Sequence, residues 1–266
     1  MADSYRDFVS TVRDFAFEQN LFDVENIIVG VSGGPDSMAL ITVLCELSKE
    51  VQNFPKVYAV HVNHSIRGED ALKDQHFVED YLNKSGVPFK SYVFDVPSEA
   101  ASCGRSLEEM GRILRYRAFD DYARELWGED YEEKSYIAVA HHKGDIAETM
   151  LMNLFRGSGL DGLSSPKCKS NRVIRPLLCV SKDEIYAYLK AKGVSYVIDS
   201  TNSEMDCTRN LWRNEILPSI KKASVKDPEA ALNDTYGLLK DDSDFIDGVA
   251  NEISERAVYR QDGIVL

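Results

Sequence analysis

Apolar runs alternate with amphipathic stretches over the first 155 residues. The runs at 26–31 and 56–64 are apolar at most positions, which is typical of strands buried on both faces. Shorter strand-like runs follow at 87–96 and 135–142, and the stretches between the runs have helical spacing, at 36–47, 69–84, 106–126 and 145–155. Strands joined in this way by helices predict an α/β fold, a parallel sheet with helices on both faces.

The pattern loosens after Leu160 and becomes helical again toward the end of the chain. A helix is expected over 181–193, and the segment from 226 to 266 is helical and acidic, with ten acidic and four basic residues. We therefore expect an α/β domain over 1–217 and a helical segment over 218–266 that begins a second domain. The apolar residues at 264–266 indicate a chain that is cut short or a short form.

The net charge, the N-terminal sequence and the spacing of the cysteines limit the classes of protein to which the chain can belong. The 266 residues carry a net charge of −13, so any contact with nucleic acid is expected to be local. The N-terminus has no apolar leader, and no run is long enough to cross a membrane, which favours a cytoplasmic protein. The five cysteines are widely spaced and form no Cys-x-x-Cys pair, so we expect reduced thiols rather than disulfides or a metal site.

The turn Ser-Gly-Gly-Pro-Asp-Ser at 32–37 follows the first expected strand and opens the first expected helix. Glycines let the backbone approach a ligand, and amides at a helix N-terminus attract anions. The flanking hydroxyls add donors, so we expect a phosphate chain to bind here, although an ordinary capped turn is the alternative. The expected phosphate cradle comprises Ser32, Gly33, Gly34, Pro35, Asp36 and Ser37.

This turn resembles the PP-loop of N-type ATP pyrophosphatases, which split ATP between the α and β phosphates. Five further motifs, in family order up to Pro218, resemble the tRNA(Ile)-lysidine synthetase family: HVNHSIRGEDALKD, EEMGRILRYRAF, AHHKGDIAETMLMNLFRGSGLDGL, RPLLCVSKDEI and DSTNSEMDCTRNLWRNEILP. The resemblance implies a ligase that uses ATP and Mg²⁺. It adenylates the C2 oxygen of the wobble cytidine in the CAU-anticodon tRNA(Ile), and free L-lysine then displaces AMP. A homodimer is compatible with the sequence, which does not decide the oligomeric state.

Asp145 and Glu148 lie three residues apart at the start of an expected helix. Paired acids at this spacing could hold or deprotonate an amine, but the same spacing suits a helix cap. The family pattern favours recognition of the lysine amine. The chain departs from the more frequent His-His-x-Asp-Asp-Gln motif at Gly144 and Ile146, which leaves the role of the first acid of that motif open.

Other candidates follow from charge and from the family match. Arg112 and Arg115 share one face of the long helix with Tyr116, and the match implies that Arg115 faces the reacting phosphates, where a guanidinium would stabilise pyrophosphate and the adenylate. For Arg112 a solvated arginine that bridges to Glu108 is the alternative. Asp36 is the expected Mg²⁺ ligand, with helix capping as its other role.

Histidines end two of the expected strands, at His61 and His64 and at His141 and His142. Adjacent histidines on an extended chain point to opposite faces, which disfavours zinc. We expect contacts to ATP or to neighbouring backbone instead, with His64 as the candidate ATP ligand.

Two basic segments are candidates for tRNA contact. The first has a local excess of five positive charges, against Asp161 alone, and comprises Arg156, Lys167, Lys169, Arg172, Arg175 and Lys182. The second is the motif with Arg209, Asn210 and Arg213, in which the two arginines lie one helical turn apart. Solvated loops are the alternative for both segments.

Two other functions fit parts of the sequence. A tRNA thiolase of the same superfamily would need a persulfide-forming cysteine, and Cys103 and Cys168 are isolated. A non-catalytic ATP-binding module would bind ATP without splitting it to AMP, and it would give no role to Asp145, Glu148 or the Arg209 motif.

Overall fold

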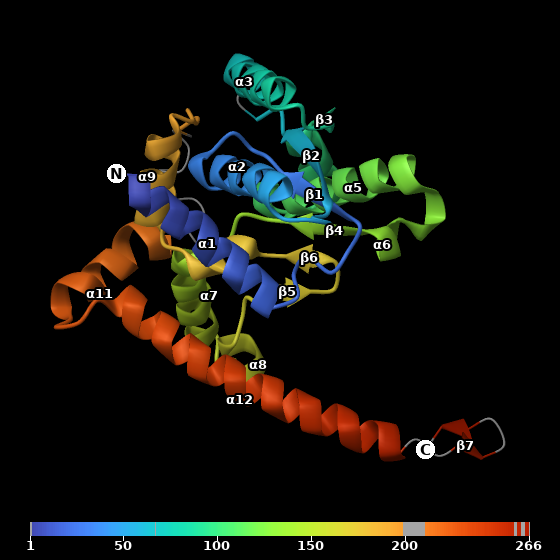
Figure 1. The fold of residues 1–266 in the computed structure, drawn as a ribbon. Coiled ribbons are helices and arrows are strands. Elements are labelled where there is room, and N and C mark those ends of the chain that lie inside the picture. Colours follow the sequence, from blue (N-terminus) through green and yellow to red (C-terminus); the bar gives the residue numbers. More distant parts are fainter. Residues whose placement is uncertain (1, 67, 199–210, 258–259, 262–263, 266) are drawn as a thin grey trace. The chain divides into compact units, whose positions relative to one another are not determined.

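The computed structural model describes residues 2–66, 68–198, 211–257, 260–261 and 264–265 (Figure 1). These residues form two compact units. Unit 1 comprises Met1–Lys143 and Cys168–Cys207, and unit 2 comprises Gly144–Lys167 and Thr208–Leu266. The expected boundary after residue 217 lies inside unit 2, and as a domain boundary it stays a prediction. None of the helices in the described ranges has the length and apolar character that a membrane crossing requires.

Unit 1 contains a six-stranded sheet in the order β3-β2-β1-β4-β6-β5. Its strands are β1 (Asn26–Gly30), β2 (Lys56–Asn63), β3 (Phe89–Val93), β4 (Ser135–Ala138), β5 (Lys169–Ser170) and β6 (Val173–Ile174). All neighbouring strands run parallel except β5 and β6, which pair antiparallel at one edge. The structure therefore confirms the predicted α/β fold with a parallel sheet over β1, β2, β3, β4 and β6, and it adds the short antiparallel β5–β6 edge.

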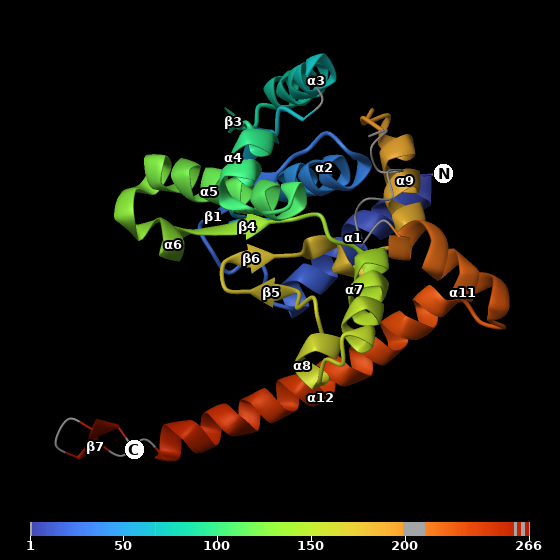
Figure 2. The ribbon, with the colours of Figure 1, turned by 180° about the vertical axis from the view of Figure 1, so that it is seen from behind.

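Helices cover both faces of this sheet (Figures 1 and 2). One face carries α1 (Ala2–Glu18), α2 (Pro35–Glu50) and α9 (Lys182–Lys192), and the other carries α4 (Val96–Cys103) and α5 (Leu107–Trp127). The remaining helices in the described part of unit 1 are α3 (Glu69–Ser85), η1 (Gly128–Asp130), α6 (Tyr131–Lys134) and η2 (Pro176–Cys179). On the second face, Ile28 packs in one buried cluster with Phe119 of α5. The alternation of β1 explains this two-sided core, because successive side chains point to opposite faces.

Unit 2 is helical. It contains α7 (Lys143–Phe155, from Gly144 on), α8 (Leu160–Leu163), η4 (Trp212–Ile216), α11 (Leu217–Ala223) and α12 (Pro228–Ala257), followed by β7 (Arg260–Gln261) and β8 (Ile264–Val265). The α12 helix lies against α8, and Tyr236 donates from its hydroxyl to the Pro166 carbonyl at 2.7 Å. Phe155 at the end of α7 packs on Trp212, with ring centroids 5.1 Å apart. The helical segment expected after residue 218 is confirmed.

Gly30 ends β1 two residues before Ser32, and the packing around it leaves no room for a side chain. A Cβ placed there would lie 2.8 Å from Cζ of the buried Phe119.

We expect Gly30→Ala to lower the free energy of unfolding by about 1–3 kcal/mol, because the core around α5 would have to shift. Urea unfolding followed by circular dichroism measures this. In Gly159→Ala the added Cβ meets nothing within 4 Å and φ is −77°, so that control should change stability by less than about 0.5 kcal/mol. Equal stability of the two variants would contradict the packing argument.

Candidate functional site

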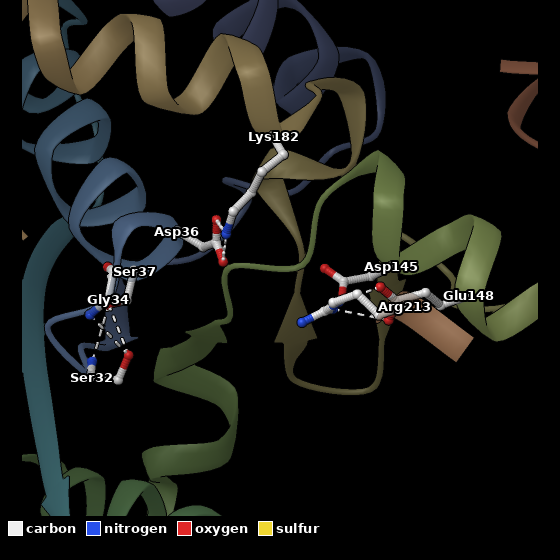
Figure 3. Close-up of polar contacts among 8 residues, drawn as sticks. All are labelled: Ser32, Gly34, Asp36, Ser37, Asp145, Glu148, Lys182 and Arg213. Atoms are coloured by element: carbon white, nitrogen blue, oxygen red, sulfur yellow. Dashed lines mark hydrogen bonds and ion pairs between the residues drawn. The ribbon is translucent and has the colours of Figure 1, made fainter. Parts of the chain in front are cut away.

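The turn at 32–37 is closed by its own serine side chains (Figure 3). The Ser32 amide donates to Ser37 Oγ at 3.1 Å, and Ser37 Oγ donates to the Gly34 carbonyl at 3.0 Å. The two hydroxyl oxygens lie 3.1 Å apart. The serines that the sequence analysis expected as donors to phosphate therefore hold the shape of the turn in this structure.

The backbone of the turn leaves donors at the start of α2. Gly34 is the N-cap residue and supplies no side-chain cap, and Pro35 follows it. The first amides of a helix have no partner within the helix, so amides not met by a side-chain cap are suited to an anion. Gly33 has φ of +89°, a conformation that favours glycine, and a Cβ there would meet Val78 Cγ2 at 3.1 Å. These features fit the predicted phosphate cradle.

Asp36, in the first turn of α2, is held by a lysine from α9. Lys182 Nζ lies 2.5 Å from Oδ1 and 2.6 Å from Oδ2 of Asp36 (Figure 3). Lys182 was expected to lie in a basic segment for tRNA, and the structure gives it this contact instead. Over the described ranges, no group of three or more His, Cys, Asp or Glu residues lies together as a metal site would require. A Mg²⁺ ion at Asp36 would thus take its remaining ligands from phosphates and water, as Mg²⁺ at phosphate sites commonly does.

Two histidines lie near this turn at the end of β2: His61 is buried and His64 is half-buried. Nδ1 of His61 lies 2.8 Å from the carbonyl oxygen of Val31, which is the residue just before the turn. His64 packs beside Gly111 of α5, where a Cβ would lie 3.5 Å from the ring. Burial, together with the nearby charges of Arg115 and His61, lowers the pKa of His64 to about 4. His64 is therefore neutral at pH 7. Among the described residues, the buried Nδ1 atom of His64 and the buried Nε2 atom of His61 have no hydrogen-bond partner.

The lowered pKa of His64 predicts a pH dependence of stability. The unfolded chain, with an ordinary histidine pKa of 6.5, binds a proton that the folded chain rejects down to about pH 4. Stability is therefore lost as the pH falls from about 7 toward 4, by about 2 kcal/mol between pH 7 and pH 5 from this residue. Urea unfolding at both pH values, with His64→Asn as comparison, measures it. A variant whose stability falls as steeply as that of the parent would contradict the assignment.

The two candidate arginines of α5, Arg112 and Arg115, have different neighbours in the structure. Arg115 lies near enough to His64 for its charge to act on the imidazole. Arg112 instead stacks over the Tyr116 ring, with its guanidinium carbon 5.3 Å from the ring centroid. Of the two residues, only Arg115 is thus tied to the histidines at the end of β2.

Asp145 and Glu148 come together on α7, in unit 2, as their spacing predicts. Both are buried, with 7% and 4% of their surfaces exposed. Each accepts from Arg213: Nε lies 2.5 Å from Glu148 Oε1, and Nη2 lies 2.9 Å from Glu148 Oε2 and 3.2 Å from Asp145 Oδ1 (Figure 3). Buried carboxylates require a cation or several hydrogen bonds, and here the guanidinium provides a cation. The sequence analysis placed Arg213 in a tRNA-binding motif and missed this contact.

The basic residues expected to meet tRNA differ in exposure and in partners. Arg156 is exposed on unit 2. Arg175 is 8% exposed and donates from Nε to His141 Nδ1 at 3.1 Å, inside unit 1. Lys167 pairs with Asp161 and Asp247, Lys169 donates to the Tyr136 hydroxyl, and Arg172 pairs with Asp120. Arg209 and Asn210 lie outside the described residues. Most of the first segment thus has partners within the protein in this structure.

Comparisons with known proteins agree on one family. The PP-loop domain family matches residues 6–220. A curated tRNA(Ile)-lysidine synthase from Caldanaerobacter subterraneus subsp. tengcongensis is 38% identical over 229 residues, which is 86% of this chain and 47% of that protein. The tRNA(Ile)-lysidine synthase from Parabacteroides distasonis is 37% identical over 215 residues, 80% of this chain and 46% of that protein. The chain thus spans about half the length of these relatives.

Among solved structures, the chain is similar to the U34-tRNA thiolase NcsA from Methanococcus maripaludis with its 4Fe-4S cluster. The TM-score is 0.62 at 19% identity, over 90% of this chain and 79% of that chain. At this identity the likeness concerns the fold alone.

Proposed function

Because the chain belongs to the PP-loop domain family, we propose that it uses ATP to join free L-lysine to the wobble cytidine of the CAU-anticodon tRNA(Ile). The C2 oxygen of cytidine attacks the α-phosphorus of ATP and pyrophosphate leaves. The ε-amine of lysine then attacks C2, and AMP leaves with that oxygen. The curated relatives named tRNA(Ile)-lysidine synthase, at 34–38% identity, support this reaction.

The observation that carries the proposal is the buried acid pair on α7. Asp145 and Glu148 together hold the guanidinium of Arg213, so this site already binds a side-chain cation. The ammonium group of lysine is a cation that the same two carboxylates can bind, and a carboxylate there can take up a proton from the amine before it attacks. A purely capping role for the two acids remains the alternative.

The residues proposed for ATP lie in unit 1. The amides that open α2 would bind phosphate oxygens, and Gly33 and Gly34 would let the backbone approach them. His64 is neutral, and its Nδ1 has no hydrogen-bond partner among the described residues; it is proposed to contact ATP. Arg115 is proposed to stabilise the negative charge that develops on the phosphates. Asp36 is proposed to ligate Mg²⁺, which supplies charge neutralisation on the phosphates when bound. Lys182 would then release at least one Asp36 oxygen.

Contacts with tRNA are proposed for Arg112, Arg156, Arg175, Arg209, Asn210 and Arg213. The exposure of Arg156 suits this role, whereas Arg175 would have to leave its contact with His141. A homodimer and a location in the cytoplasm are likewise proposals, and neither is needed for the reaction.

Product analysis tests the reaction type. With ATP labelled at the α-phosphate, Mg²⁺, L-lysine and a CAU-anticodon tRNA(Ile) transcript, we expect labelled AMP whose amount depends on both lysine and tRNA. Labelled ADP would contradict cleavage between the α and β phosphates, and AMP that forms equally without lysine would contradict lysine as the acceptor.

The same assay separates ligation from sulfur transfer. Burial raises the pKa of Cys45 to about 11 and that of Cys179 to about 12, so both are thiols at pH 7 and poor nucleophiles. Cys103 is the exposed cysteine among those described. A ligase needs no thiolate, so Cys103→Ser should leave lysine-dependent AMP formation unchanged, and a loss of activity would favour a thiolase.

A further inference from the structure

Arg213 lies in an unusual turn of unit 2. It belongs to η4, a π-helical turn over Trp212–Ile216. Trp212 of this turn packs on Phe155, and Arg213 reaches Asp145 and Glu148, so the turn contacts α7 near both of its ends. Single π turns hold an extra residue at some cost and occur frequently at functional sites. The turn thus places one specific side chain on the acid pair.

The contact has the form of a cation placed on a preformed anionic site. Both guanidinium nitrogens that face Glu148 meet its two oxygens, at 2.5 and 2.9 Å, in the bidentate arrangement that suits arginine. The carboxylate side chains are 10% and 5% exposed, whereas the arginine side chain is 43% exposed. The arginine is therefore the partner in this contact that is open to water, whereas the two acids are covered.

We propose that Arg213 is an internal competitor of the amine substrate: it occupies the Asp145–Glu148 pair until an amine displaces it. This inference rests on the proposed function, in which the same pair receives the lysine amine. An ammonium and a guanidinium cannot both take the same carboxylate oxygens, so the apparent affinity for an amine is the intrinsic affinity multiplied by the fraction of molecules in which Arg213 has left the pair. Arg213 then lowers the affinity of every amine by the same factor, so that an amine with no other contacts stays largely unbound.

Amine binding to the full chain, without ATP or tRNA, tests the inference. L-lysine and propylamine hydrochloride are each titrated by isothermal titration calorimetry into the parent, Arg213→Gln, Arg213→Lys and Lys222→Gln. Lys222 is exposed on α11 of the same unit, so its variant removes the same charge from a neighbouring position. We expect Arg213→Gln to bind propylamine and lysine at least about tenfold more tightly than the parent, Arg213→Lys to fall between them, and Lys222→Gln to match the parent.

The outcomes separate the inference from the function. Lysine binding of equal or lower affinity in Arg213→Gln, with propylamine unchanged, overturns the inference and leaves the function standing. Tighter propylamine binding in Arg213→Gln, with lysine bound by none of the proteins, supports the competitor and overturns lysine as the substrate. Thermal unfolding of each variant shows whether it folds. If Arg213→Gln does not fold, the amine affinities of Arg213→Lys and the parent are compared instead.

Discussion

The Glu148→Gln variant is expected to raise the KM for lysine by about 30-fold or more, with a much smaller effect on the KM for ATP. Glu148 is buried and offers both oxygens to a cation. Glutamine keeps the size of the side chain and removes its charge, and the loss of a buried charged partner costs about 2–5 kcal/mol. The variant also loosens Arg213, which offsets a part of this loss. Rates of AMP formation against lysine concentration measure the effect.

Asp161→Asn is the matched control for this experiment. Asp161 belongs to the same unit, its side chain is 85% exposed, and it pairs with Lys167 at the surface. An exposed pair contributes little, so the lysine KM of this control should stay within about twofold of the parent. An unchanged lysine KM in Glu148→Gln would favour the capping role and contradict amine recognition.

The second large effect is expected at Asp36. Asp36→Asn should lower kcat for AMP formation by about 100-fold or more, because the amide is a poor ligand for Mg²⁺ and leaves the phosphate charge less neutralised. Both Asp36 oxygens are held by Lys182, so the variant also frees a lysine at this position. Single-turnover rates over a range of Mg²⁺ concentrations measure the effect.

Asp183→Asn provides the comparison for Asp36. Asp183 is exposed and lies beside Lys182 in the first turn of α9, so its variant removes a nearby negative charge without touching the phosphate cradle. Its rate and Mg²⁺ dependence should match the parent. A normal Mg²⁺ dependence in Asp36→Asn would mean that the ion has another ligand.

The central sheet could be predicted because its signal is local. The apolar runs of β1 and β2 and the glycine turn before α2 each occupy a few consecutive residues, and burial on both faces needs no partner to be recognised. The strands β5 and β6 have two residues each. Their pairing depends on tertiary contacts, and so periodicity did not reveal them. The helix α4 was also missed, although Asp95 caps it by accepting from the Ser98 amide.

The cations that bind the acidic groups could not be predicted, since they lie far away along the chain. Lys182 is 146 residues from Asp36, and Arg213 is 65 residues from Glu148. The sequence placed both cations in basic segments, where helical spacing or a local excess of charge suggested tRNA contact. A buried carboxylate needs a positive partner. This requirement could have indicated that such a partner exists, but it could not have identified which lysine or arginine it is.

Incorporation of lysine into RNA tests the central claim most directly. The protein is incubated with ATP, Mg²⁺, radiolabelled L-lysine and either a CAU-anticodon tRNA(Ile) transcript or the same transcript with uridine at the wobble position. We predict one lysine in the first RNA for each AMP released, and none in the second. AMP release without label in the first RNA, or equal labelling of the two RNAs, would contradict lysine ligation to the wobble cytidine.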